Sequence, residues 1–323
     1  MNKRVYGVLG VSAVMANWNA DFSGYPKTTS EGQVFGSDKA FKYPMKKMWE
    51  DQGEKVLYIK SMCFDEDKNG VRLIPKTLKQ RYEQLFDVKD LKEEKDAKIV
   101  LSNLFKAIDV KNFGATFAEA DNNISIAGAV QFGQGFNKYD NSQAFEQPIL
   151  SPFRDPKAKE KSAKKKGKEA EEGEEAKNST LGSKIVSDEA HYFYSFNINP
   201  MAYKGFVELG VTDGYTDEDY QNFKKTALTA TTSFATNSKA GCENEFGLFV
   251  ETEEDLYLPN LAEFVQFEKG QDKNLITLNC SQLLNEVKKQ TKAVEIYYNP
   301  YTTQLNQDIQ GAKLFNIFTQ NEI

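Results

Sequence analysis

Residues 15–49 decide the fold, and they read MANWNADFSGYPKTTSEGQVFGSDKAFKYPMKKMW. The end of an apolar strand leads into a polar loop with glycines, and a helix completes the stretch. Phe41, Met45 and Met48 recur at helical spacing, which predicts a stripe that faces the core. Pro44 removes one intrahelical hydrogen bond, so we expect a kink or a break there.

The same helix carries three lysines on a different face. Lys39, Lys42 and Lys46 stand at i, i+3 and i+7, after Ser37 or Asp38 as the expected N-cap. Such a stripe is either the solvated side of an amphipathic helix or a local positive surface that binds phosphates. The pattern of charges alone leaves both interpretations open.

The composition sets limits on the class of protein. With 323 residues, 40% of them hydrophobic, the chain can form one large domain or two ordinary ones. A net charge of −6 argues against coating nucleic acid with the whole surface, but it permits a local basic stripe. The one histidine, His191, lies in a strand-like run, so we expect a structural role and exclude a multi-histidine metal site. Carboxylates could still hold Mg²⁺.

Cysteine spacing and hydropathy indicate where the protein works. Cys63, Cys242 and Cys280 have no zinc or redox spacing, which predicts reduced thiols and a cytoplasmic location. No run reaches the roughly 18 apolar residues of a membrane span. The apolar run after Arg4 is interpreted as a strand and not as a signal peptide, because it contains glycines and leads directly into the polar loop.

Strand–helix–strand patterns occur at both ends of the chain. They are Arg4–Ala16, the lysine helix and Lys55–Phe64, and then Leu275–Leu278, Gln282–Lys289 and Val294–Tyr298. This order predicts an α+β, ferredoxin-like core (β-α-β-β-α-β) with large insertions. RNA-recognition domains share that topology, although their signature motif is absent here.

Two further segments lie between these patterns. Val110–Tyr139 is rich in glycine and is predicted to contain a hairpin around residues 121–123. Residues 154–183 are first basic and then acidic, with almost no apolar side chain, which predicts a disordered loop. We expect this loop to interrupt one domain that spans residues 1–323.

Five motifs resemble a known family. They are VYGVLGVSAVMANWNADFSGYPKTT (5–29), VFGSDKAFKYPMKKMW (34–49), VKNFGATF (110–117), IAGAVQFG (126–133) and YSFNINP (194–200). In this order they resemble the Csh-type backbone subunit of type I-B CRISPR surveillance (Cascade) complexes, in the Cas seven family of the RAMP superfamily. Lys111 and Ala129 depart from that pattern, which often has arginine and proline at these positions.

The resemblance implies a modified RNA-recognition-motif domain with a palm, fingers and a thumb hairpin. Copies of it would polymerise along CRISPR RNA, pair with target DNA through the guide, contact other Cascade subunits and serve a recruited nuclease-helicase indirectly. No cofactor and no membrane are expected. The thumb is assigned to either Val110–Tyr139 or Ser195–Gly214. The expected RNA contacts are Asn17, Asn19, Lys27, Lys39, Lys42, Lys46, Gln131, Phe132 and Gly133.

Two other function classes stay open. Related subunits of type III complexes cut RNA with an aspartate in the loop after the first strand, and Asp21 lies in that loop here. The type I-B resemblance instead implies a non-catalytic subunit, because cleavage belongs to a separate nuclease-helicase. A free-standing RNA-binding regulator is the third possibility.

Overall fold

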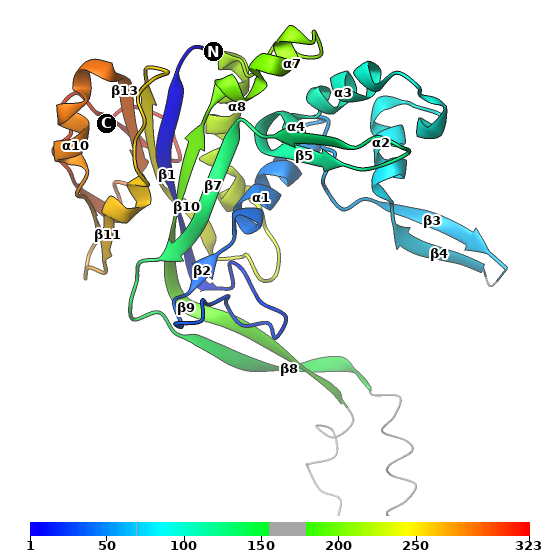
Figure 1. Ribbon diagram of the computed structural model, residues 1–323. Coiled ribbons are helices and arrows are strands. Elements are labelled where there is room, and N and C mark those ends of the chain that lie inside the picture. Colours follow the sequence, from blue (N-terminus) through cyan, green and yellow to red (C-terminus); the bar gives the residue numbers. More distant parts are fainter. Residues whose placement is uncertain (69, 155–178) are drawn as a thin grey trace, which may run out of the picture.

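The computed structural model describes residues 1–68, 70–154 and 179–323 (Figure 1). Its largest sheet is built around β1 (Arg4–Ala16), which pairs antiparallel with β9 (Ser179–Ile198) on one side and β10 (Cys242–Thr252) on the other. Val5, Val8 and Leu9 are fully buried. β1 is therefore a central strand that is buried on both faces, as its nearly continuous apolar sequence indicates.

The other strands of this sheet extend outward from β1. Within the described residues the order is β15-β13-β10-β1-β9-β7-β2, and β8 pairs with β9. Every neighbouring pair is antiparallel except β13 and β15. These strands are β2 (Phe35–Gly36), β7 (Val130–Asn137), β8 (Ala144–Arg154), β13 (Thr291–Tyr298) and β15 (Lys313–Asn316).

Helices and small sheets surround this sheet. The helices are α1 (Asp38–Asp51), α2 (Leu78–Phe86), α3 (Ala97–Lys106), α4 (Ile108–Phe113), α7 (Lys204–Glu208), α8 (Asp217–Ala227), α9 (Ala230–Ser233) and α10 (Ser281–Glu286). The small sheets pair β3 (Met62–Asp67) with β4 (Gly70–Pro75), β5 (Gly114–Phe117) with β6 (Ile124–Ala127), and β12 (Asn274–Leu278) with β11 (Val265–Glu268) and β14 (Thr303–Asn306). None of the described helices is long and apolar enough to cross a membrane.

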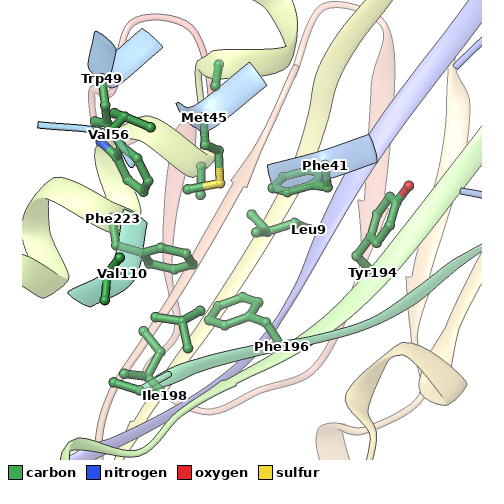
Figure 2. Close-up of a cluster of buried hydrophobic side chains, with 14 of the residues drawn as sticks. Leu9, Phe41, Met45, Trp49, Val56, Val110, Tyr194, Phe196, Ile198 and Phe223 are labelled. Carbon is green, nitrogen blue, oxygen red and sulfur yellow. The ribbon is translucent and has the colours of Figure 1, made fainter. Parts of the chain in front are cut away.

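Each face of the large sheet buries its own hydrophobic cluster. On one face, Leu9 and Phe196 of the sheet meet Phe41 and Met45 of α1 and Phe223 of α8 (Figure 2). On the other face, strand residues such as Val8 and Leu248 pack against β11, β12 and α10. The alternation of side chains along β1 supplies both clusters from one strand.

Helix α1 forms largely as its sequence indicates. The Ser37 hydroxyl accepts a hydrogen bond from Ala40 N, which confirms the N-cap, and Phe41 and Met45 are buried. Of the kink or break expected at Pro44, the break does not occur, because the helix continues through it. Pro44 is itself buried, and this burial together with the flanking Phe41 and Met45 offsets the missing hydrogen bond.

Both strand–helix–strand assignments need correction. The segment 55–60 is not a strand, because Leu57 N and Tyr58 N donate to the Asp109 carboxylate and not to a neighbouring strand. Strand β3 starts only at Met62 and pairs with β4 alone. At the other end, β12 and β13 belong to different sheets, since β12 helps to cover the second hydrophobic cluster.

The two candidate thumb segments also differ from expectation. Val110–Tyr139 includes the β5–β6 hairpin, but its last part is β7 of the large sheet. Ser195–Gly214 is not a hairpin, because Pro200 starts a 3₁₀ helix directly after β9 and α7 follows. A third element, the β8–β9 ribbon, extends far beyond the body of the sheet (Figure 1).

The predicted disordered loop, residues 154–183, lies mostly outside the described residues. Its two ends are nevertheless strand, because Arg154 ends β8 and residues 179–183 begin β9. The strands therefore continue further into the charged segment than its composition indicates.

His191 lies in β9, as its strand-like context predicts, and is 2% exposed. Its Nδ1 lies 2.7 Å from Glu245 Oε2, its Nε2 lies 3.0 Å from Glu189 Oε1, and its ring stacks on Phe267. Burial by itself lowers the pKa of His191, but the two carboxylates outweigh burial and raise the pKa above its usual value. Folding therefore favours the imidazolium form of His191, which joins β9 to β10 through Glu245.

We predict that this imidazolium makes stability depend on pH. Its pKa is raised on folding, so its contribution is complete below about pH 6.5, the usual unfolded value, and is lost as the pH rises through the folded pKa. Denaturant unfolding from pH 6 to pH 9 should show falling stability in the native chain. The His191→Gln variant should be less stable at pH 6 and lack this slope. An equal slope in both proteins contradicts the prediction.

Candidate nucleic-acid interface

A hollow of about 620 Å³ lies between α1 and the β5–β6 hairpin. Its α1 side consists of Lys39, Lys42, Tyr43 and Lys46. The opposite side is formed by Tyr58, Phe113, Gly114, Ala115, Thr116 and Ile126. Lysines and aromatic side chains together are what a sequence-tolerant nucleic-acid surface requires.

Lys39 and Lys42 are the cations of this hollow that pair with no buried carboxylate. Lys39 is exposed, and within the described parts of the chain it forms no ion pair. Lys42 is 15% exposed, with Nζ 2.9 Å from Asp38 Oδ2 and 5.2 Å from the centre of the Phe113 ring. The ring orients the ammonium group, and its carboxylate partner Asp38 is the first residue of α1.

Lys46 has a different role from the one that its spacing predicts. Its Nζ donates to the Tyr58 carbonyl at 3.1 Å and lies 3.5 Å from the Asp109 carboxylate, which is fully buried. Burial lowers the pKa of Lys46, although the Asp109 charge opposes this. Lys46 therefore lines the hollow, like the other two lysines, but its ammonium group also neutralises a buried carboxylate.

Tyr58 completes the same network. Burial, with the charges of Asp109 and Glu119, raises the pKa of Tyr58 to about 12. Its hydroxyl therefore stays protonated and donates to Thr116 O at 2.6 Å, on β5. The lysine face of α1 and the β5–β6 hairpin are in this way held at a fixed separation across the hollow.

The amides expected to contact RNA hold the loop after β1. Asn17 is 4% exposed and donates to the Gly24 and Ile185 carbonyls, while Asn19 Oδ1 accepts from Ser37 N at 2.8 Å. Both side chains are therefore used for structure. Lys27 is half-buried, and its backbone pairs with Asn19 and Phe35.

Gln131, Phe132 and Gly133 do not form a turn. They belong to β7, where a bulge between Phe132 and Gly135 shifts the register against β9. Gln131 is exposed and donates to Gly128 O, and Phe132 packs on Phe41. The bulge follows from close approach, since a Cβ on Gly133 would collide with the Ser195 hydroxyl.

Three hollows share residues and form one path. Phe113 and Ile126 line both the lysine hollow and a second hollow of about 510 Å³. Gln131 and Asn197 line both that second hollow and a third of about 310 Å³. The path thus connects the lysines of α1 with Gln131 and Gly133 of β7, which the resemblance also implies as RNA contacts.

Asp21 organises its own loop. Its Oδ1 accepts from Ser23 N at 2.8 Å, from Ser23 Oγ at 2.7 Å and from Tyr25 N at 3.1 Å. These bonds, that from the Ser23 hydroxyl first, lower the pKa of Asp21. Across residues 1–68, 70–154 and 179–323, no group of three His, Cys, Asp or Glu side chains is placed to hold a metal ion.

Sequence reasoning missed two residues of this site, Tyr43 and Asp109. The sequence could have indicated Tyr43, because it stands four residues after Lys39 and three before Lys46 on one helix. No sequence pattern indicates Asp109, since 63 residues separate it from Lys46 and only the folded chain brings them together.

Comparisons with known proteins place the chain in a family. The curated proteins contain no match. Of two similar solved structures, "CRISPR RNA-guided surveillance complex, pre-nicking" is 13% identical, with 94% of this chain and 96% of that chain covered and a TM-score of 0.46. The other, "CRISPR RNA-guided surveillance complex", is also 13% identical, with 92% and 91% covered and a TM-score of 0.45. The family model "CRISPR-associated protein Cas7" matches residues 3–288, most of the chain, and the chain therefore belongs to the Cas7 family.

Proposed function

We propose that this chain is a non-catalytic CRISPR RNA-binding backbone subunit of a type I-B surveillance complex. The observation that carries this proposal is the path of hollows that starts at Lys39 and Lys42. It provides a local cationic and aromatic surface on a chain of net charge −6. Such a surface binds a sugar–phosphate backbone without reading bases, and base pairing by the guide would supply sequence specificity.

The strand order supports a ferredoxin-like core. The four strands β10-β1-β9-β7 are mutually antiparallel neighbours. In the chain, α1 lies between β1 and β7, and α8 lies between β9 and β10. This is the β-α-β-β-α-β order with a different second half from the one expected, because β9, α8 and β10 take the place of the C-terminal elements.

We assign the thumb to the β8–β9 ribbon. It protrudes from the sheet (Figure 1), as an element that reaches between segments of a guide duplex must. We further propose that target DNA, other Cascade subunits and a recruited nuclease-helicase meet this chain in the assembled complex. The assignment to type I-B and to the Csh type rests on the five sequence motifs, of which residues 5–29 are the longest.

The proposal predicts a salt-dependent effect of two lysines. Lys39→Ala and Lys42→Ala should each weaken the binding of single-stranded RNA, about equally for every RNA sequence. Each lost phosphate contact should lower the slope of log affinity against log salt by roughly 0.7. Binding titrations at several salt concentrations measure both quantities, with Lys47→Ala as the control, because Lys47 pairs with Glu50 and Asp51 and does not line the hollow. Wild-type affinity and salt slope in the Lys39/Lys42 double variant would show that these two lysines do not contact RNA phosphates.

Lys46 should respond differently, because removing it leaves Asp109 buried without its counter-charge. Lys46→Ala should lower the free energy of unfolding by on the order of 3 kcal/mol, with loss of RNA binding as a consequence of unfolding. The double variant Lys46→Met with Asp109→Asn should recover part of that stability.

A further prediction concerns assembly. Copies that repeat along one strand make heterologous contacts, which give open filaments and not closed dimers. Light scattering should therefore show association that grows with RNA length. A closed dimer unaffected by RNA would contradict this and favour a free-standing regulator.

The last prediction of the proposed function concerns catalysis at Asp21. Its Oδ1 accepts three hydrogen bonds within its own loop, which fix the orientation of the carboxylate. We expect complexes assembled with guide RNA and incubated with complementary RNA and Mg²⁺ to leave that RNA intact, in the native chain and in Asp21→Ala alike. Regularly spaced cuts that disappear in Asp21→Ala would establish the enzyme alternative.

A further inference from the structure

We propose that Tyr43 is a stacking platform for one base of the bound RNA, so that the lysine hollow holds a base as well as phosphates. The inference rests on the proposed function and adds to it a residue, a type of contact and a preference among bases.

Tyr43 borders the lysine face of α1. It lines the hollow together with Lys39, four residues earlier, and Lys46, three residues later. Its side chain is 44% exposed, although the aromatic rings nearest to it in sequence on this helix, Phe41 and Trp49, are buried. An aromatic ring is thus presented to solvent among ammonium groups.

A second aromatic ring packs against the ring of Tyr43 and limits its movement. Phe234, in the segment after α9, contacts it edge-to-face, with ring centres 5.5 Å apart and an angle of 71°. Because α1 is anchored through Phe41 and Met45, the helix cannot turn this ring into the core. A fixed, exposed ring loses little conformational freedom when a base stacks on it.

The surroundings favour a nucleobase over another partner. Lys39 and Lys42 on the same hollow would bind the phosphates on either side of a base. The opposite side of the hollow adds apolar surface from Phe113 and Ile126. Within the described residues the Tyr43 hydroxyl makes no hydrogen bond, so the ring and not the hydroxyl is the feature that the site presents.

The test compares Tyr43→Leu and Tyr43→Phe with the native chain on three probes of equal length: oligoadenylate, oligouridylate and an abasic strand. Tyr43→Leu should bind oligoadenylate on the order of tenfold more weakly, oligouridylate less so, and the abasic strand as the native chain does. Its salt slope should be unchanged, since no phosphate contact is lost. Tyr43→Phe should keep native affinity. A 2-aminopurine in the strand should be quenched by the native chain and by Tyr43→Phe, but less by Tyr43→Leu.

The outcomes separate this inference from the proposed function. Native affinity of Tyr43→Leu for all three probes, or equal weakening on the abasic strand, overturns the stacking role. If Lys39→Ala still lowers affinity and salt slope in that case, the proposed function stands without it. Failure of the native chain to bind any probe overturns both. Thermal unfolding midpoints of the two Tyr43 variants confirm that each is folded before affinities are compared.

Discussion

The structure depends on the burial of β1 on both of its faces and along both of its edges. Its ladder to β9 and its ladder to β10 leave no free edge, and each face supplies one hydrophobic cluster. Gly7 permits this close packing, because a Cβ there would collide with the Leu248 carbonyl oxygen and the Phe196 ring. Since β1 cannot shift, the loop and helix that follow it start from a fixed position.

A buried ion pair then connects the helix to the segments beyond it. Asp109 accepts hydrogen bonds from Leu57 N and Tyr58 N, and the ammonium group of Lys46 lies beside it. A buried carboxylate needs such partners, because desolvation of an unpaired charge is costly. Lys46 therefore stabilises the fold, whereas Lys39 and Lys42 pair with no buried carboxylate. The same contact places the β5–β6 hairpin opposite α1, and so it creates the hollow.

The proposed RNA path is consistent with an acidic protein. Phosphate binding depends on local potential, and at 0.1 M salt this decays over a Debye length of about 10 Å. In the proposed function, Lys39 and Lys42 would therefore act on an RNA strand in the hollow with little influence from distant carboxylates. Aromatic rings beside these lysines add a contact that salt does not screen.

The sequence by itself determined the local elements and the family. Helical spacing and a serine cap specify α1, continuous apolar character specifies β1, and residues 5–29 carry the resemblance that the Cas7 family match supports. It could not determine which strands share a sheet, because alternation defines a strand but not its partner; β12 and β13 are the example. The sequence also could not distinguish the site residues that stabilise the fold from those that are available to a ligand. Lys42 and Lys46 look alike in the pattern, and only the tertiary structure brings Asp109 to one of them, since ion pairs across 63 residues depend on how the chain closes. Asn17 was a candidate ligand contact by type, yet burial and two backbone carbonyls make it a loop anchor.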